Sequence, residues 1–169
     1  MPLEYFAGQR LTADALQRAV TYRVVQNDSQ SVASSTTLVD SNIVINVDDL
    51  MEIRLSARYE SGGGGIRWRW GTSGSISVSE ARDIVSAGDN TTAGPSLLDH
   101  MRHRSVLTLG ETQLVAHIAN ATSFLIEERV VVQGSGSLTF EFAQETSNAG
   151  ETVLFPQSYA SVTYLGPDV

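Results

Sequence analysis

An unbroken alternation of apolar and polar side chains runs from residue 51 to residue 60 and constrains the fold more than any other feature. Its apolar members occupy every second position: Met51, Ile53, Leu55, Ala57 and Tyr59. Successive side chains of a strand point to opposite faces of a sheet, so this period of two predicts a half-buried antiparallel strand. Ile66, Trp68 and Trp70 alternate with arginines in the same way and predict a second strand.

Four consecutive glycines separate these two runs and predict that the strands form a hairpin. We expect Tyr59 to lie opposite Trp68, because that register also pairs Glu60 with Arg67. A register shifted by two, with Tyr59 opposite Ile66, loses this ion pair and is the alternative.

A second hairpin is predicted from Phe124–Val132, the turn sequence QGSGS and Leu138–Ala143. This pairing sets Arg129 opposite Glu141, a favourable cross-strand contact. Shorter strand candidates are Tyr22–Gln26, Ile43–Val47, Ser75–Val78, Val106–Leu109, Gln113–Ile118, Thr152–Phe155 and Tyr159–Leu165. Many short strands between turn signals predict a sandwich or barrel, and we favour an all-β, antiparallel, jelly-roll-like β-sandwich.

The chain divides into an N-terminal arm, residues 1–20, and a sandwich domain, residues 21–169. Thr12 is a good N-cap and predicts a short helix within the arm. The stretch 79–104 shows no alternation, so we expect an excursion out of the sheet, with a helical turn or two at Glu80–Val85 and another at Ser96–His103. The arm has more apolar surface than a free tail, which predicts docking on another protein. Its candidate anchor residues are Leu3, Tyr5, Phe6, Leu11 and Leu16.

Composition excludes several function classes. The chain has no cysteine, so disulfides and thiolate metal sites are ruled out. A net charge of −8 argues against a nucleic-acid partner. All its basic residues are arginines, which removes Schiff-base chemistry and the lysine of a phosphate-binding loop. No window is apolar over the roughly 20 residues that span a bilayer. We therefore expect no membrane partner, and the first residues predict no signal peptide.

The histidines are the first candidates for chemistry. His100 and His103 could share one face of a helical turn, a spacing that some metal sites use. Arg102 and Arg104 disfavour a cation there, so we prefer a solvated turn and expect no metal and no cofactor. A Ser-His-Asp triad is a further alternative, but the nucleophile pattern G-x-S-x-G is absent from the sequence.

Glutamates and tryptophans are the other candidates. Glu127, Glu128 and Glu141 could supply the paired carboxylates of a glycosidase. We prefer ordinary strand charges, since Glu141 has an arginine partner in the predicted hairpin, and we expect no catalytic residues. Trp68 and Trp70 could form a sugar-stacking platform if exposed. Their alternation with arginines places them on an apolar face, which favours the core.

Both ends of the chain resemble phage proteins. FAGQRLTADAL resembles the opening of many short phage virion proteins, and the C-terminal third resembles the last strands of minor tail or tail-fibre proteins of actinobacterial phages. The C-terminal matches are Gly136, Leu138, Phe140, Phe142, Ala143, Gln144, Thr146, Ser147, Asn148, Ala149, Thr152, Val153, Ser158 and Tyr159. The chain departs from the pattern at Phe142, where tryptophan is common, and at Pro156–Gln157. Residues 22–120 match these proteins only in their general residue pattern. The resemblance implies a virion β-sandwich, often a trimer.

Together these observations predict a non-enzymatic structural component of a tailed-phage virion: a minor tail, tail-tip or capsid decoration protein. The strand Tyr159–Leu165 has no strongly polar face, which predicts a homo-oligomer, with a trimer implied by the resemblance. The candidate interface residues are Leu125, Val131, Ala160, Val162 and Tyr164. Expected partners are further copies, other virion proteins and a host surface glycan. The alternative functions are a host receptor- or carbohydrate-binding module and, third, a glycan-degrading enzyme.

Overall fold

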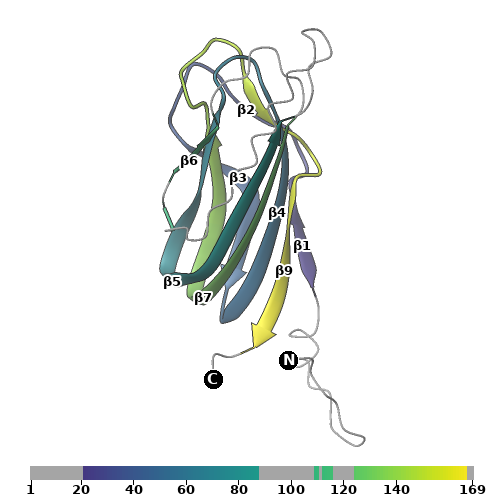
Figure 1. Ribbon diagram of the computed structural model, residues 1–169, viewed down its shortest axis with the longest axis vertical. Coiled ribbons are helices and arrows are strands. Elements are labelled where there is room, and N and C mark those ends of the chain that lie inside the picture. Colours follow the sequence, from purple (N-terminus) through teal and green to yellow (C-terminus); the bar gives the residue numbers. More distant parts are fainter. Residues whose placement is uncertain (1–20, 88–108, 111, 116–123, 167–169) are drawn as a thin grey trace, which may run out of the picture.

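Nine strands form one antiparallel sheet in the part of the chain that the structure describes. The computed structural model describes residues 21–87, 109–110, 112–115 and 124–166. The strands are β1 Tyr22–Val25, β2 Gln30–Val32, β3 Val39–Val47, β4 Leu50–Ser61, β5 Ile66–Ala87, β6 Gln113–Val115, β7 Phe124–Ala143, β8 Thr152–Leu154 and β9 Tyr159–Gly166 (Figure 1). The main order is β1-β9-β4-β7-β5-β6, with β3 on β7 and β8 between β2 and β4. The all-β, antiparallel part of the predicted fold is confirmed, but in place of the predicted jelly-roll-like sandwich the described strands form one sheet.

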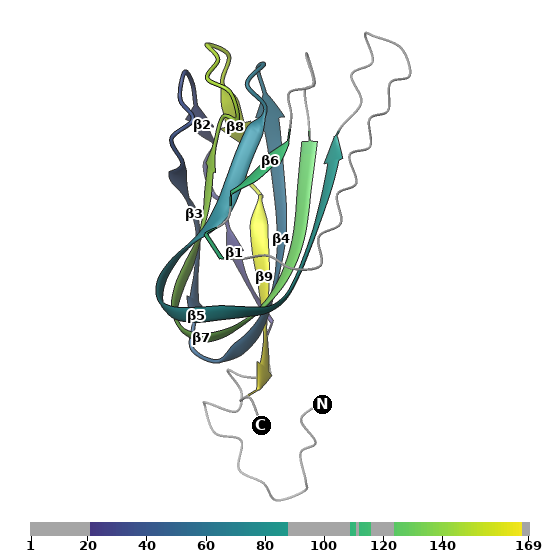
Figure 2. The same ribbon diagram turned by 60° about the vertical axis from the view of Figure 1, so that its left-hand side comes forward.

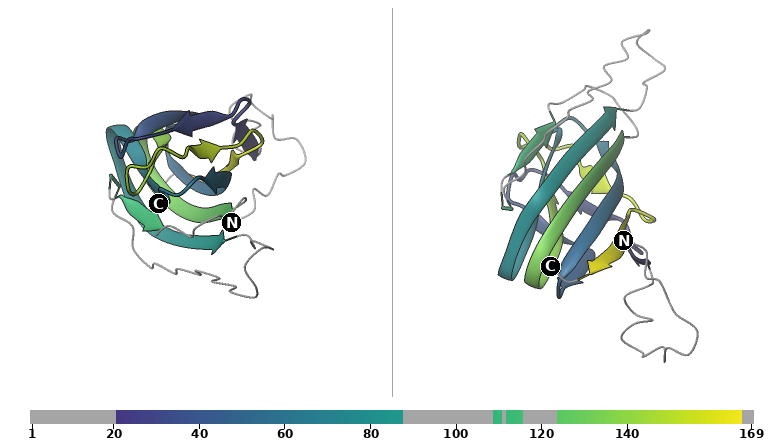
Figure 3. Two further views of the ribbon diagram at one scale, coloured as in Figure 1. Left: turned by 90° about the horizontal axis from the view of Figure 1, so that it is seen from above. Right: turned by 60° about the horizontal axis from the view of Figure 1, so that its bottom comes forward.

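The two longest strands fold this sheet back on itself. The first half of β7 pairs with β4 and its second half with β3, while β5 follows β7 along its length. Both long strands curve around the lower end of the molecule (Figure 2). We call the β1-β9-β4 side, with residues 124–132 of β7, layer A, and the β3 side, with residues 136–142 of β7, layer B. Seen from above, the sheet wraps into a nearly closed barrel (Figure 3), so the two layers belong to one sheet and not to two.

Glycines permit the bend. Gly74 of β5 lies opposite Gly136 of β7, and both have positive φ, as does Gly134. A Cβ atom on Gly134 would overlap the carbonyl oxygen of Ser75, and one on Gly136 that of Ser73. Only glycine tolerates this backbone conformation and this close approach at little cost.

The second predicted hairpin is therefore wrong, because Phe124–Val132 and Leu138–Ala143 are two parts of the single strand β7. Arg129 lies opposite Arg54 on one side and does not face Glu141. A short glycine-containing run is typical of both a turn and a bend. Here the ladder with β5 continues through the run, so the strand curves and does not reverse.

The first predicted hairpin is also wrong. Tyr59 pairs with Phe124 of β7 and Leu154 of β8, whereas Trp68 pairs with Phe142 in layer B. The alternative register, with Tyr59 opposite Ile66, fails for the same reason, since β4 pairs with β7, β8 and β9 and not with β5.

The four glycines, Gly62–Gly65, cross from layer A to layer B. The crossing is held by main-chain hydrogen bonds from Gly62 N to Glu151 O at 2.7 Å and from Thr146 N to Gly64 O at 2.9 Å. A Cβ on Gly64 would approach the Thr146 carbonyl oxygen to 2.6 Å, so the close crossing requires glycine there.

The core fills the space between the layers with side chains from both. The predicted inward face of residues 51–59 is confirmed, and Trp68 and Trp70 are buried core residues. The largest fully buried side chains are Trp68, Trp70, Tyr59, Phe140, Phe142, Ile43, Ile45, Ile53, Ile66, Ile126, Leu138 and Leu154. The helical turn expected at Glu80–Val85 is wrong, because β5 extends through it to Ala87.

Several predictions lie outside the described residues: the arm 1–20 with its helix and anchor residues, the helical turn at Ser96–His103, the strand Val106–Leu109 up to residue 108, and all three histidines. Within the described ranges, no three His, Cys, Asp or Glu side chains are grouped to hold a metal ion. The same ranges contain no helix long and apolar enough to cross a membrane.

Candidate interaction surface

The outer side of layer A brings outward-facing side chains of β9, β4 and β7 into rows. Arg54 lies between Ser161 on β9 and Arg129 on β7. One step along the strands, Ser56 lies between Tyr159 and Glu127 in the next row. Two arginines directly opposite each other destabilise a sheet unless an acid compensates them.

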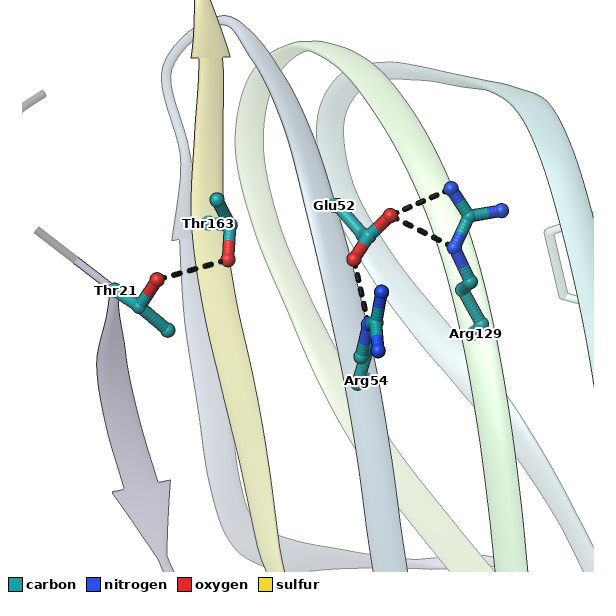
Figure 4. A network of polar contacts seen from close by, with 5 residues as sticks. All are labelled: Thr21, Glu52, Arg54, Arg129 and Thr163. Carbon is teal, nitrogen blue, oxygen red and sulfur yellow. Dashed lines mark hydrogen bonds and ion pairs between the residues drawn. The ribbon is translucent and has the colours of Figure 1, made fainter. Parts of the chain in front are cut away.

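Glu52 supplies that compensation. Its Oε1 accepts a hydrogen bond from Arg54 Nε at 2.6 Å. Its Oε2 accepts from Arg129 Nε at 2.7 Å and lies 2.5 Å from Arg129 Nη2 (Figure 4). Partial burial alone would raise the pKa of Glu52, but the hydrogen bonds and charges of both arginines outweigh it and lower the pKa below its ordinary value. The three side chains therefore form one fixed network.

The edge of this surface at β1 is also ordered. The Arg23 guanidinium lies over the Tyr159 ring, 4.8 Å from its centroid, a cation–π geometry. Thr21, the residue before β1, and Thr163 of β9 share a hydroxyl hydrogen bond of 3.1 Å (Figure 4). Burial, followed by the nearby charge of Asp48, raises the pKa of Tyr22.

Between the two rows lies an open depression of about 360 Å³. Its walls and floor come from Arg54, Ser56, Glu127, Arg129, Tyr159 and Ser161. Leu55 and Glu128, whose side chains face the core, complete the lining. The serines are small where their neighbours are large, which is why the surface is hollow here.

Glu128 is a buried carboxylate that the sequence interpretation treated as an ordinary strand charge. It is 3% exposed and lies between the layers. Its Oε2 accepts a hydrogen bond from Trp68 Nε1 at 3.2 Å, and its Oε1 accepts one from Trp70 Nε1 at 3.1 Å. The sequence did contain a signal for this buried role. Glu128 has the inward parity of Ile126 and Val130, and two buried indole N–H groups need a hydrogen-bond acceptor.

The other sequence candidates for chemistry are placed as follows. Glu141 forms an ion pair with Arg69 across the β5–β7 ladder, which replaces the expected pairing with Arg129. Glu127 is exposed on the outer side, so it points away from Glu128, which faces the core. The structure therefore does not bring the three glutamates together on one surface.

The five candidate interface residues do not form one surface. Ala160 and Val162 are fully buried in the core of the single chain, and Tyr164 packs beside it with its hydroxyl donating to Asp49 Oδ2 at 2.6 Å. Leu125 and Val131 alternate with the inward side chains of β7 and so take the opposite, outer parity, but Val131 is nevertheless buried and Leu125 only partly exposed. The choice of the Ala160 face was wrong because the alternation of β9 does not reveal which side is inward. Its outer side carries Tyr159, Ser161, Thr163 and Leu165.

The loops at the upper end are joined by one buried amide. Gln144 Oε1 accepts hydrogen bonds from Ser35 N at 3.2 Å and Asn148 N at 3.0 Å, and its Nε2 donates to Gly150 O at 2.5 Å. Ser158 Oγ likewise accepts from Arg58 N at 3.0 Å, tying the start of β9 to β4. These side chains set the loop geometry above the barrel.

No family model and no curated protein matches the chain. Among solved structures, it is similar to a chain in the structure of infectious bursal disease virus Gx strain, with 11% identity and a TM-score of 0.21. The alignment covers 87% of this chain and 37% of the viral chain, so this chain spans well under half of that length. At such a TM-score the likeness supports no inference about fold or function.

Proposed function

We propose that this chain is a non-enzymatic structural component of a tailed-phage virion: a minor tail or tail-tip protein, or a capsid decoration protein. It assembles as a homo-oligomer, with a trimer favoured, and docks on the particle through residues 1–20. The order of the oligomer and the location in a virion come from the resemblance of the chain ends to phage proteins.

One observation supports the proposal above the others: residues that carry the resemblance occupy fold-determining positions. Gly136 lies at the bend of β7, where a Cβ would overlap Ser73. Gln144 joins the upper loops, and Ser158 joins β9 to β4. Residues at such positions determine the fold. Proteins that share them are therefore expected to share an architecture and the structural role that depends on it.

Three experiments test this function. Light scattering of the purified chain at micromolar concentration is expected to give the mass of an oligomer; a stable monomer would reject the assembly, and a dimer would reject the trimer. Locating the chain in a reconstruction of a phage particle tests the virion role. Deleting residues 1–20 is expected to leave a folded barrel that no longer joins the particle, and full occupancy by the deleted form would reject the anchor.

A second candidate function is a carbohydrate-binding module of the virion. The depression on layer A favours it, because hydroxyl, carboxylate, guanidinium and aromatic groups converge there on a rigid sheet. The depression shares the outer side of β7 with Leu125 and Val131, so the two functions are compatible in one chain only where the oligomer is built through another surface.

A further inference from the structure

The depression on the outer side of layer A has the composition of a ligand site and not of a plain solvated face. Its volume of about 360 Å³ lies within the range of small-molecule sites, roughly 300–1,000 Å³. All its side chains project from the paired strands β4, β7 and β9. Groups on such a scaffold are held more rigidly than groups on loops.

The polar groups around the depression are held in place by contacts outside it. Glu52 accepts a hydrogen bond from Nε of Arg54, so the two terminal nitrogens of Arg54 can bind other partners. Glu52 also fixes the guanidinium of Arg129 at the far wall. Arg23 covers one face of Tyr159 and fixes that ring. Groups fixed in advance lose less conformational entropy when a ligand binds.

The charges around the site nearly balance. Arg23, Arg54 and Arg129 are positive, while Glu52 and Glu127 are negative. A strongly anionic ligand would gain little here and would approach a chain of net charge −8. A cation would meet the arginines. A neutral ligand that both donates and accepts hydrogen bonds fits the site best.

We propose that this depression binds one neutral saccharide unit. Adjacent hydroxyls of a sugar can donate to the Glu127 carboxylate and accept from the terminal nitrogens of Arg54. Ser56 and Ser161 offer hydroxyls at the floor, and Tyr159 offers an apolar wall for the C–H groups of the sugar ring. The inference rests on the second proposed function and names its ligand class and residues.

The probes are methyl glycosides of glucose, galactose, mannose, rhamnose and N-acetylglucosamine, with glucuronic acid and N-acetylneuraminic acid as anionic comparisons. Saturation-transfer NMR with the full chain is expected to show binding of at least one neutral glycoside. Ser56→Leu fills the floor and is expected to abolish that binding. Glu127→Gln, at an exposed position that the fold does not need, is expected to weaken it about tenfold or more, the effect of losing a charge-assisted hydrogen bond.

Matched controls lie away from the site. Thr139→Leu repeats the Ser56 change on β7 of layer B, and Glu151→Gln repeats the Glu127 change at an exposed loop. Both are expected to bind like the native chain. The proposal is overturned if no neutral glycoside binds, if only the acidic sugars bind, or if Glu127→Gln and Ser56→Leu leave binding unchanged. Any of these results leaves the virion role standing, because that role is tested by the particle reconstruction and the oligomer mass.

Discussion

Trp68 and Glu128 meet across the core from opposite layers, with the indole Nε1 3.2 Å from the carboxylate Oε2. The second carboxylate oxygen accepts the indole N–H of Trp70. One side chain of layer A thus satisfies the buried donors of two large aromatic residues of layer B. An indole N–H without an acceptor in this position would cost free energy on folding.

Replacing Glu128 with leucine should therefore destabilise the chain even though the core becomes more apolar. Two buried donors lose their acceptor, so we expect the free energy of unfolding to fall by about 2–4 kcal/mol. Urea unfolding followed by tryptophan fluorescence measures it directly, since Trp68 and Trp70 are the only tryptophans in the sequence. Glu127→Leu, one residue earlier on the exposed side, is the control and should change stability far less. Equal stability of Glu128→Leu and the native chain would contradict this role.

The bend of β7 gives a second prediction. Gly134→Ala should destabilise by more than about 2 kcal/mol, because its Cβ overlaps the Ser75 carbonyl oxygen and its φ is +134°. Gly166→Ala separates the two causes, since φ is +105° there but no atom lies within 4 Å of the added Cβ. It should cost only about 1–2 kcal/mol. Thermal unfolding of both variants measures the difference, and similar losses would mean that backbone strain, not overlap, requires the glycine.

The Glu52 network predicts a pH dependence. The lowered pKa of Glu52 means that its ionised form stabilises the fold above its unfolded-state pKa of about 4.3. This contribution disappears as the pH falls through the folded-state pKa. The stability difference between the native chain and Glu52→Gln should thus be constant above about pH 5.5 and shrink below about pH 4. Solvent screening limits it to about 1 kcal/mol. Urea unfolding of both proteins from pH 3 to 7 is the measurement, and a difference that grows toward low pH would contradict the sign.

Gln144 should control the loops more than the barrel. Gln144→Ala removes the acceptor of Ser35 N and Asn148 N and the donor to Gly150 O. We expect faster amide exchange in both loops and a loss of about 1–3 kcal/mol. Hydrogen exchange read by mass spectrometry separates the loops from β4 and β7. Uniform loss of protection across the barrel would show that Gln144 supports the whole fold instead.

The sequence predicted strands well and their partners poorly. The alternation at Met51–Glu60 is a local signal, and the structure confirms both the strand and its inward face. The partners of that strand lie in β7, β8 and β9, between 65 and 116 residues later in the chain. A glycine run between two strands favours a hairpin only when the strands are considered alone. In the barrel, Gly62–Gly65 connects opposite layers.

The candidate surface was only partly predictable for a related reason. The outward parity of Arg54, Ser56 and Glu127 follows from the alternation of β4 and β7. Their convergence with Tyr159 and Ser161 depends on β9 lying beside β4, a pairing with no local signal. Glu128 could have been recognised from its inward parity, but its acceptor role required the position of both indoles.

The placement of β9 between β1 and β4 has a consequence for how the chain reaches this state during synthesis. Of the described strands, β1 is synthesised first, but it pairs with β9, which is synthesised last. β1 therefore stays unpaired until nearly all of these strands have been made. Among the described strands, only β5 and β6 both pair and follow one another in sequence. Pairings between distant strands slow folding, because the entropy cost of closing a long loop comes before the stabilising contacts form. The nascent chain therefore exposes the unpaired edges of β1 and β4 until β9 emerges, an interval in which a holding chaperone or a second nascent copy can bind them.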